Sequence, residues 1–302
     1  MRKERRKTIR SKQEIIVSCI VFPILFLWSL TLLYPFLWAF LNSLKEPGEF
    51  LLDSFSLPDK WLFSNWATAV KTLNVPKSNP LETVGILGMI VNSIWWMFGS
   101  VLVNTVVTAM MAYALAKYHY RIGKFLHAFS LVVMTISVVG AFPSQYALYN
   151  KLHITNSPAM LLTSAGCIGT SSLLIYYSFF KNISWSYAEA VFIDGGGHWT
   201  VFLKVMIPQA IPIISAMAVI GCIGLWNDYF TPYIYLRDFP TLATGLYLLQ
   251  TSSLTVNNKP LYFAVVLLSA LPIFIIFMCF QEKIMTSVSM GCLLYTSPSP
   301  RD

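Results

Sequence analysis

Glu189 and Asp194 are the acids best placed for chemistry, because they stand in a short polar interval between two long apolar segments. Three consecutive glycines follow at 195–197, and Pro208 closes the interval. A polar segment of this length is too short for a catalytic domain, but it is long enough for two short helices that dock on another protein. The two acids could then meet basic residues of that partner.

The residues before the glycines predict a short helix over about 187–193. Ser186 and Glu189 have the spacing of a capping box, in which each side chain bonds to the other residue's backbone N–H. Gly195 stands where such a helix needs a left-handed terminator, and Gly196 keeps the turn small.

A second helix is expected after the glycines, with apolar side chains at three- and four-residue spacing. They form one face, which needs a protein or membrane surface to cover it. Pro208 then suits the first turn of the following membrane span. The face consists of Trp199, Phe202, Val205 and Met206.

The remaining polar residues do not predict a reactive centre. The four histidines lack metal-ligand spacing, and a membrane-embedded enzyme would require paired acids, a histidine cluster or a Ser/Lys arrangement within the apolar segments. The sequence also lacks the G-x-x-x-x-G-K motif that cradles nucleotide phosphates. We therefore expect this chain to bind neither a cofactor nor ATP.

Asp228 is the clearest acid inside a predicted span, where an acid costs about 2.5–3.5 kcal/mol on insertion scales. Asn227 and Asp228 therefore either line a translocation path or a permease interface, or fix helix packing. Asn104 and Gln145 are further candidates for that path, but polar side chains also join membrane helices, and for these two the packing role is favoured.

The composition predicts an all-α integral membrane protein. The chain is 56% hydrophobic and 11% charged, with a mean hydropathy of +0.63, whereas soluble domains carry about 25% charged residues. A membrane-spanning helix needs about 20 apolar residues, and six segments reach this length. They are about 15–41, 88–116, 125–149, 158–180, 208–236 and 260–281.

Basic residues predict the orientation of these spans. Seven of them precede the first span, where a membrane anchor is a better interpretation than a nucleic-acid-binding segment. With the N-terminus inside, the cytoplasmic segments hold thirteen Lys and Arg residues and the outer segments seven. The positive-inside rule then places both termini and residues 181–207 in the cytoplasm.

The chain therefore divides into a basic N-terminus over 1–14, a six-span domain over 15–291 and a terminal segment over 292–302. The terminal segment resembles the in-frame translation of a transposase mosaic-end adapter used in sequencing libraries. We hypothesise that it is a sequencing artefact; a genuine Ser/Pro-rich tail is the alternative.

Several motifs resemble those of ATP-binding-cassette importer permeases. The polar interval resembles their EAA loop, and 193–199 resembles its sugar-type version. Residues 226–230 with Pro232 resemble the family's fifth-helix signature, and Asn92-Ser93 with 112–116 resemble its second helix. Over roughly 15–291 the chain is similar to carbohydrate permeases of the maltose-permease type, closest to the branch that takes up oligosaccharides or polysaccharide products.

The resemblance assigns coupling to an ATPase to a loop over 184–207 and the proline that follows it. Three positions depart from the family pattern: Val191 replaces a usual Ala, Gly196 a common Ala, and Ser184 a frequent Pro. The assigned residues are Glu189, Ala190, Val191, Asp194, Gly195, Gly196, Trp199, Phe202, Val205, Ile207 and Pro208.

The resemblance implies a type I importer permease fold in a bacterial cytoplasmic membrane. The expected partners are a second, non-identical permease, two ATPase subunits that use ATP and Mg, and an extracellular or periplasmic solute-binding protein. The implied cargo is carbohydrate. An importer for another solute, such as a peptide or polyamine, is the first alternative, and a membrane-embedded enzyme is a remote one.

Overall fold

The computed structural model describes residues 12–118, 120–136, 140, 142–252 and 258–296. Most of the basic N-terminus and residues 297–302 of the terminal segment lie outside the described residues, so the predictions about them stand as made. The chain forms two compact units: Met1–Val70 with Gln250–Leu268, and Lys71–Leu249 with Ser269–Asp302.

The first unit is built on the long helix α1 (Lys12–Ser43), whose apolar side chains are exposed along most of its length. At its end Trp38 packs on Phe50 of α2 (Pro47–Leu52) and on Phe263, with ring centroids 6.3 and 5.1 Å away. The helix α3 (Ser64–Thr72) begins in this unit, where the Asn65 amide donates two bonds of 2.9 Å, to the carbonyl of Ser43, the last residue of α1, and to that of Lys45.

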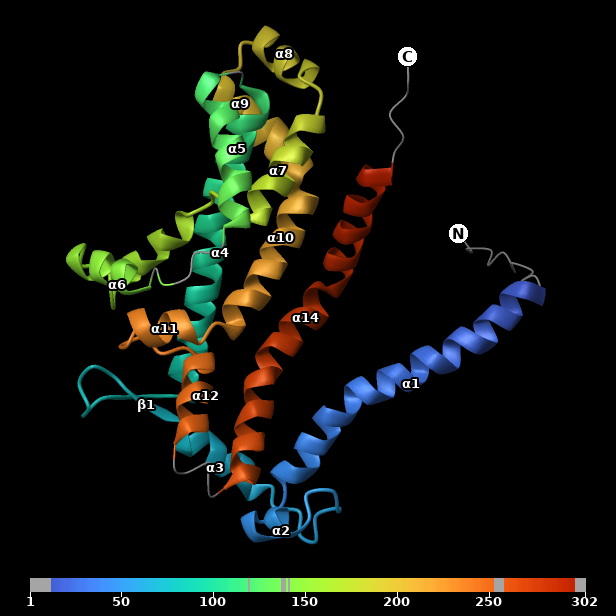
Figure 1. Cartoon of the computed structure of the whole chain (residues 1–302), viewed down its shortest axis with the longest axis vertical. Helices are drawn as coiled ribbons and strands as arrows, with labels where there is room; N and C mark the ends of the chain where they lie inside the picture. The colour runs from blue at the N-terminus through green and yellow to red at the C-terminus, as the bar shows by residue number, and fades with distance from the viewer. Residues whose placement is uncertain (1–11, 119, 137–139, 141, 253–257, 297–302) are drawn as a thin grey trace. The chain divides into compact units, whose positions relative to one another are not determined.

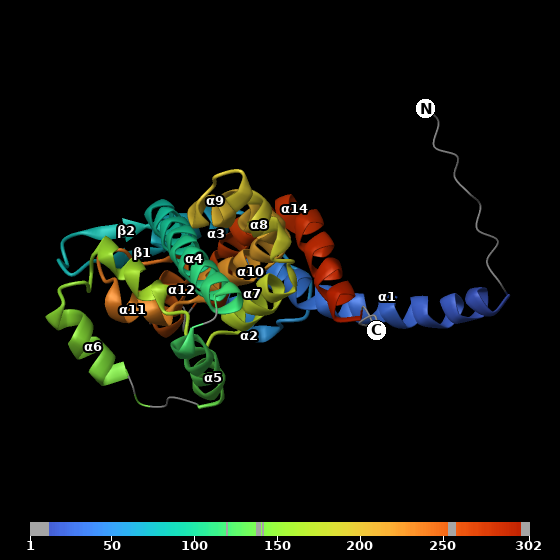
Figure 2. The ribbon, with the colours of Figure 1, turned by 90° about the horizontal axis from the view of Figure 1, so that it is seen from above.

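The second unit is organised around α4 (Ile86–Lys117). The helices α7 (Ser171–Asn182) and α10 (Ile207–Asn227) and the 3-10 helix η1 (Pro158–Ala165) pack against it, and Figures 1 and 2 both place α7 and α10 beside it. Small residues such as Ser100, Thr108 and Ala112 are buried on α4. Small side chains let helix backbones approach closely without a large apolar core.

Two predicted spans are broken in the structure. Residues 125–149 form α5 (Arg121–Thr135) and α6 (Phe142–Lys151) instead of one helix, with Gly140 at a φ of +88° between them. Residues 158–180 form η1 and α7, separated by Gly169 at a φ of +80°. Helix α5 is capped by Ile136 and η1 by Gly166, both with extended backbones, so the two left-handed glycines lie in the connections that follow. The apolar residues on either side hid these breaks from hydropathy.

The other predicted spans correspond to helices. Among the described residues, three helices are long and apolar enough to cross a membrane: Cys19–Ser43, Ile86–Lys117 and His198–Asn227. The span over 208–236 ends early and is followed by the short helix α11 (Phe230–Tyr235). The last span lies within α14 (Lys259–Thr296). Six membrane crossings and the orientation of the termini stay predictions.

A small β-hairpin corrects the all-helical expectation. Strand β1 (Asn74–Pro76) pairs antiparallel with β2 (Thr83–Gly85), with Val75 opposite Val84. The hairpin and α12 (Leu242–Thr251) lie at the end of this unit opposite the polar interval (Figure 1). Its short strands carry too few residues for a period-two pattern to be read from the sequence.

Candidate functional site

The polar interval folds as two short helices joined by a glycine turn. Helix α8 (Ser186–Ile193) begins one residue earlier than predicted, and α9 (His198–Val201) follows the glycines. The predicted capping box is wrong: Ser186 lies inside the helix, and its hydroxyl pairs with that of Ser184 at 2.8 Å. The N–H of Ser186 also donates to the Ser184 hydroxyl at 3.3 Å, so Ser184 supports the helix start.

The glycine turn is a complete Schellman motif, of which the sequence predicted the left-handed residue at Gly195. Gly195 has a φ of +78° and its N–H donates to the Phe192 carbonyl at 3.0 Å. The Gly196 N–H donates to the Val191 carbonyl at 2.8 Å. These two bonds satisfy the last free carbonyls of α8, so the turn is set by backbone bonds and not by side chains.

The second helix does not end at Pro208. Residues 202–206 form the π-helical turn η2 (Phe202–Met206), in which the Ile207 N–H donates to the Phe202 carbonyl. Helix α10 continues directly from it with Pro208 at its second residue. A proline lacks a backbone N–H donor, and its ring crowds the carbonyl four residues earlier. A wider π-helical turn before Pro208 relieves this crowding. The interval is therefore continuous with the following long helix.

The apolar face of this second helix differs from the prediction. Phe202 and Met206 are buried, with 6% and 0% of their surface exposed, and Val205 is half-buried. Trp199 instead lies beside the face. Its ring packs against the Phe202 ring in a T-shaped arrangement with centroids 6.2 Å apart, yet 64% of the Trp199 surface is exposed. Val201, which was not part of the predicted face, is buried.

Aromatic and polar contacts hold the interval against the ends of α4 and α7. Tyr113 of α4 packs on Phe202 and on Phe180, with ring centroids 5.0 and 5.7 Å away. The Tyr118 hydroxyl hydrogen-bonds to Nδ1 of His198 at 2.8 Å. The Lys117 ammonium donates to the Ile183 carbonyl. The interval is thus a fixed projection of the helical unit.

The outer surface of the projection is both acidic and apolar. Glu189 and Asp194 are exposed, and among the described residues neither forms an ion pair. Apolar side chains surround them. The most exposed are Tyr187, Ile193, Trp199 and Leu203.

A polar cavity of about 350 Å³ lies among α4, α7 and α10. It brings together Asn104 and Asp228, two of the four residues predicted to form a path. Asn104 donates to the Ser164 carbonyl at 3.0 Å. The Asp228 carboxylate accepts from the N–H groups of Phe230 and Thr231 at 3.0 and 3.1 Å, and therefore also binds the first two N–H groups of α11.

The other two predicted path residues are not among those that line this cavity. Asn227 is exposed and donates to the Ile223 carbonyl one turn earlier at 2.8 Å. Gln145 is exposed on α6, where it donates to the Tyr149 hydroxyl at 2.8 Å. Asn227 is the last residue of α10 and Asp228 is its C-cap with an extended backbone, so the two side chains point in different directions although they adjoin in sequence.

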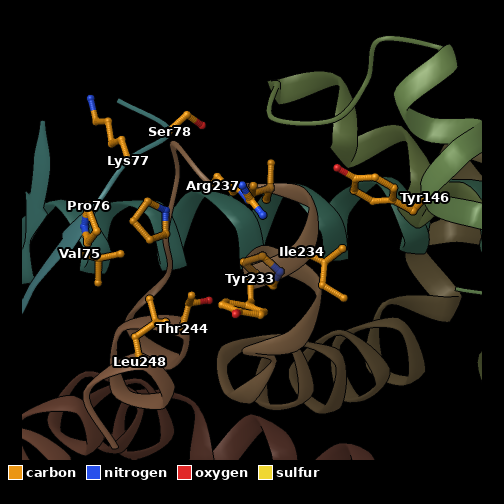
Figure 3. Close-up of a pocket in the computed structure, with 13 residues that line it drawn as sticks. Val75, Pro76, Lys77, Ser78, Tyr146, Tyr233, Ile234, Arg237, Thr244 and Leu248 are labelled. Carbon is orange, nitrogen blue, oxygen red and sulfur yellow. The ribbon is translucent and has the colours of Figure 1, made fainter. Parts of the chain in front are cut away.

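A second cavity of about 420 Å³ lies at the hairpin end of the unit (Figure 3). Its lining includes Lys77 of the hairpin, Tyr146 of α6, Tyr233 of α11 and Arg237. The sequence did not single out these residues, because they come from segments up to 160 positions apart.

Asp238 joins the segments around this cavity. Its carboxylate accepts from the Ser78 N–H at 2.8 Å and from the Asn156 amide, and its own N–H donates to the Asn156 side chain at 2.7 Å. Asn156 holds a left-handed backbone with a φ of +55°. The Ser78 N–H, the Ser78 and Asn156 side chains and nearby Lys77 lower the pKa of Asp238, although partial desolvation opposes them.

Comparison with known proteins places this architecture in a family. The model of the binding-protein-dependent transport system inner membrane component matches residues 66–290. A diacetylchitobiose uptake system permease protein of Streptomyces coelicolor is 30% identical over 89% of this chain and 86% of its own length. A probable starch degradation products transport system permease protein of Thermoanaerobacterium thermosulfurigenes is 23% identical, over 88% of this chain and 93% of its own.

Further relatives agree. A maltose/maltodextrin transport system permease protein of Photorhabdus laumondii is 26% identical over 89% of this chain and 93% of its own length. A crystal structure of a bacterial ABC transporter involved in the import of the acidic polysaccharide alginate contains a chain with the same fold. It aligns with a TM-score of 0.70 at 21% identity, covering 91% of this chain and 99% of that one. The chain therefore belongs to the family of binding-protein-dependent transport system inner membrane components, the permease subunits of ABC importers.

Proposed function

We propose that this permease subunit imports carbohydrate and that residues 184–207, here the docking loop, couple it to a cytoplasmic ATPase. The relatives support the cargo, because they are permeases for diacetylchitobiose, for starch degradation products and for maltose or maltodextrin. Those relatives are transport subunits and not enzymes. A cargo such as a peptide or polyamine has no comparable support among them.

The exposed surface of α8 and α9 carries the proposal. It combines two acids that form no ion pair within the described part of the chain with Ile193 and Trp199, whose surfaces are 85% and 64% exposed. Exposed apolar groups of this size beside charges are typical of protein docking surfaces. Basic residues of an ATPase would meet the acids, and an apolar groove would cover the two large side chains.

The continuity of α9, η2 and α10 supplies a route for coupling. A partner that moves α9 also moves α10, because no flexible segment separates them. Helix α10 contributes to the polar cavity that contains Asn104 and Asp228. In the proposed cycle the ATPase subunits close when they bind ATP, the docking loop follows, and the cavity opens towards the outer side.

The proposed assembly contains this chain, a second and non-identical permease, two ATPase subunits that use ATP and Mg, and an external solute-binding protein. Both termini and the docking loop lie on the cytoplasmic side of a bacterial membrane. The excess of Lys and Arg in the segments on that side supports this orientation.

The test is a pull-down from native membranes with an N-terminal tag, combined with cross-linking. A short cross-linker is attached to the cysteine of Ile193→Cys at the docking surface. The matched control is Leu81→Cys at the hairpin end, because the Leu81 side chain is also highly exposed, at 92%. We expect an ATPase and a second permease in the complex, with the ATPase cross-linked to position 193 only. Recovery of the chain alone from gently solubilised, active membranes would overturn the proposal.

A further inference from the structure

A third cavity, of about 490 Å³, lies where the end of α4, the first turns of α5 and the end of α7 meet. It adjoins the docking loop, since Tyr118 both lines it and bonds to His198. Its lining includes three cations, Arg121, Lys124 and Lys181. None of them belongs to the exposed surface of α8 and α9 or lines the polar cavity.

The charge in this cavity is unbalanced. Among the described residues, those that line it include no Asp or Glu. In the part of the chain that the structure describes, none of its three cations has a carboxylate within ion-pair distance. Like charges gathered in one hollow repel one another, so a bound anion would stabilise the arrangement.

Aromatic rings give the cavity a defined wall. The rings of His127 and Tyr177 lie 4.2 Å apart, and the Lys181 ammonium lies 5.8 Å from the centre of the Tyr177 ring. Gly123 leaves room for the ring of Tyr120, whose atoms would lie 3.1 Å from an added Cβ. Tyrosine rings beside cations are typical of membrane proteins at the level of the lipid headgroups.

The apolar surface next to the cations distinguishes a lipid from a free anion. Helix α5 exposes Ile122 and Phe125, each by 66%, and Phe129 by 43%. The Phe125 and Phe129 rings stack with centroids 5.9 Å apart, four and eight residues after Arg121 and therefore on the same face of the helix. A ligand with a negative head and an apolar tail would contact both surfaces, whereas inorganic phosphate would use only the cations.

We propose that this cavity binds the phosphate headgroup of an anionic phospholipid, with the acyl chains along α5. Basic pockets between membrane helices bind anionic headgroups in this way, and each Lys or Arg near the surface contributes about 1 kcal/mol, or roughly fivefold in affinity. The lipid would lie against the segment that supports the docking loop.

The test measures lipid retained by the complex purified from membranes. Wild type and an Arg121→Gln, Lys124→Gln, Lys181→Gln variant are equilibrated with equal amounts of dioleoylphosphatidylglycerol and dioleoylphosphatidylcholine in detergent, and bound lipid is counted by native mass spectrometry. The matched control removes the same charge from exposed sites, as Lys60→Gln, Lys71→Gln, Lys151→Gln. Circular dichroism shows that each variant is folded.

We expect wild type and control to retain phosphatidylglycerol over phosphatidylcholine by at least tenfold, and the cavity variant to lose most of that preference. Equal retention of both lipids by wild type, or an unchanged preference in the cavity variant, would overturn the proposal. So would displacement of phosphatidylglycerol by millimolar inorganic phosphate, which would indicate a free-phosphate site. Loss of the ATPase from the cavity variant with its lipid preference intact would show that the cations contact a protein instead. Coupling is measured separately by the cross-link at position 193, so the two proposals fail independently.

Discussion

The Val191 side chain and Gly196 are in direct contact across the turn of the docking loop. A Cβ added to Gly196 would lie 2.5 Å from Cγ1 of Val191 and 3.0 Å from its carbonyl oxygen. Both positions are ones where the resemblance to the EAA loop leads us to expect alanine. The two departures are therefore coupled: the larger residue at 191 fills the space that the missing methyl at 196 leaves.

This contact predicts that the two positions compensate each other. Gly196→Ala alone would overpack the turn at a cost of about 1–3 kcal/mol, and would reduce both ATPase recovery and ATP-driven uptake. Val191→Ala in the same chain would restore much of the loss. The measurement is a double-mutant cycle on the amount of ATPase that copurifies. Purely additive effects of the two substitutions would contradict the contact.

Gly195 should tolerate only residues that accept a left-handed backbone. Its φ of +78° is unfavourable for a β-branched residue, so Gly195→Val would distort the turn and lower uptake several-fold. Gly195→Asn is the matched control, because Asn visits this conformation at lower cost. Uptake assays on membranes with equal amounts of each variant would check this. Equal activity of the Val and Asn variants would argue against a structured turn in the working protein.

Reversing the charge at Glu189 should weaken the attachment of the ATPase. Glu189→Lys exchanges an acid for a base in the first turn of α8, which costs the helix at most about 1 kcal/mol, and it presents a cation to a surface expected to be basic. Less ATPase would copurify, and the defect would shrink at high salt because exposed charges are screened. Glu46→Lys, an exposed acid in the first unit, is the control. A normal yield of ATPase with Glu189→Lys would remove this residue from the contact.

Two substitutions separate the two roles left open for Asp228. Asp228→Ala removes the acceptor for the N–H groups of Phe230 and Thr231, which costs about 1 kcal/mol of local stability. Asp228→Asn keeps an acceptor and removes only the charge. We expect both variants to assemble and both to transport poorly, by at least tenfold for Asp228→Ala. Full uptake by Asp228→Asn would leave Asp228 with the capping role alone.

The Asp238 contacts predict a loss of stability in acid. The pKa of this carboxyl is lower in the folded chain than its ordinary value of 3.8, so its contribution is complete above that value and disappears as the pH falls through and below it. The thermal midpoint of wild type should therefore fall more steeply than that of Asp238→Asn as the pH falls below about 4. Parallel curves for the two proteins would show that the contacts do not persist in solution.

The amino-acid sequence by itself determined the features that depend on composition and on neighbours in the chain. Long apolar runs predicted a membrane protein, and a glycine after an apolar turn predicted the left-handed residue at 195. The spacing of Glu189, Gly195 and Pro208 identified the family. These features are local because backbone conformation and hydropathy act over a few residues.

Tertiary structure alone decided which distant residues meet. It brought Asn104 to Asp228 and Asp238 to Asn156, and it left Gln145 elsewhere. It also broke two apolar runs into shorter helices at Gly140 and Gly169. These outcomes depend on how α4, α7 and α10 pack, and packing selects one arrangement among many that hydropathy allows equally.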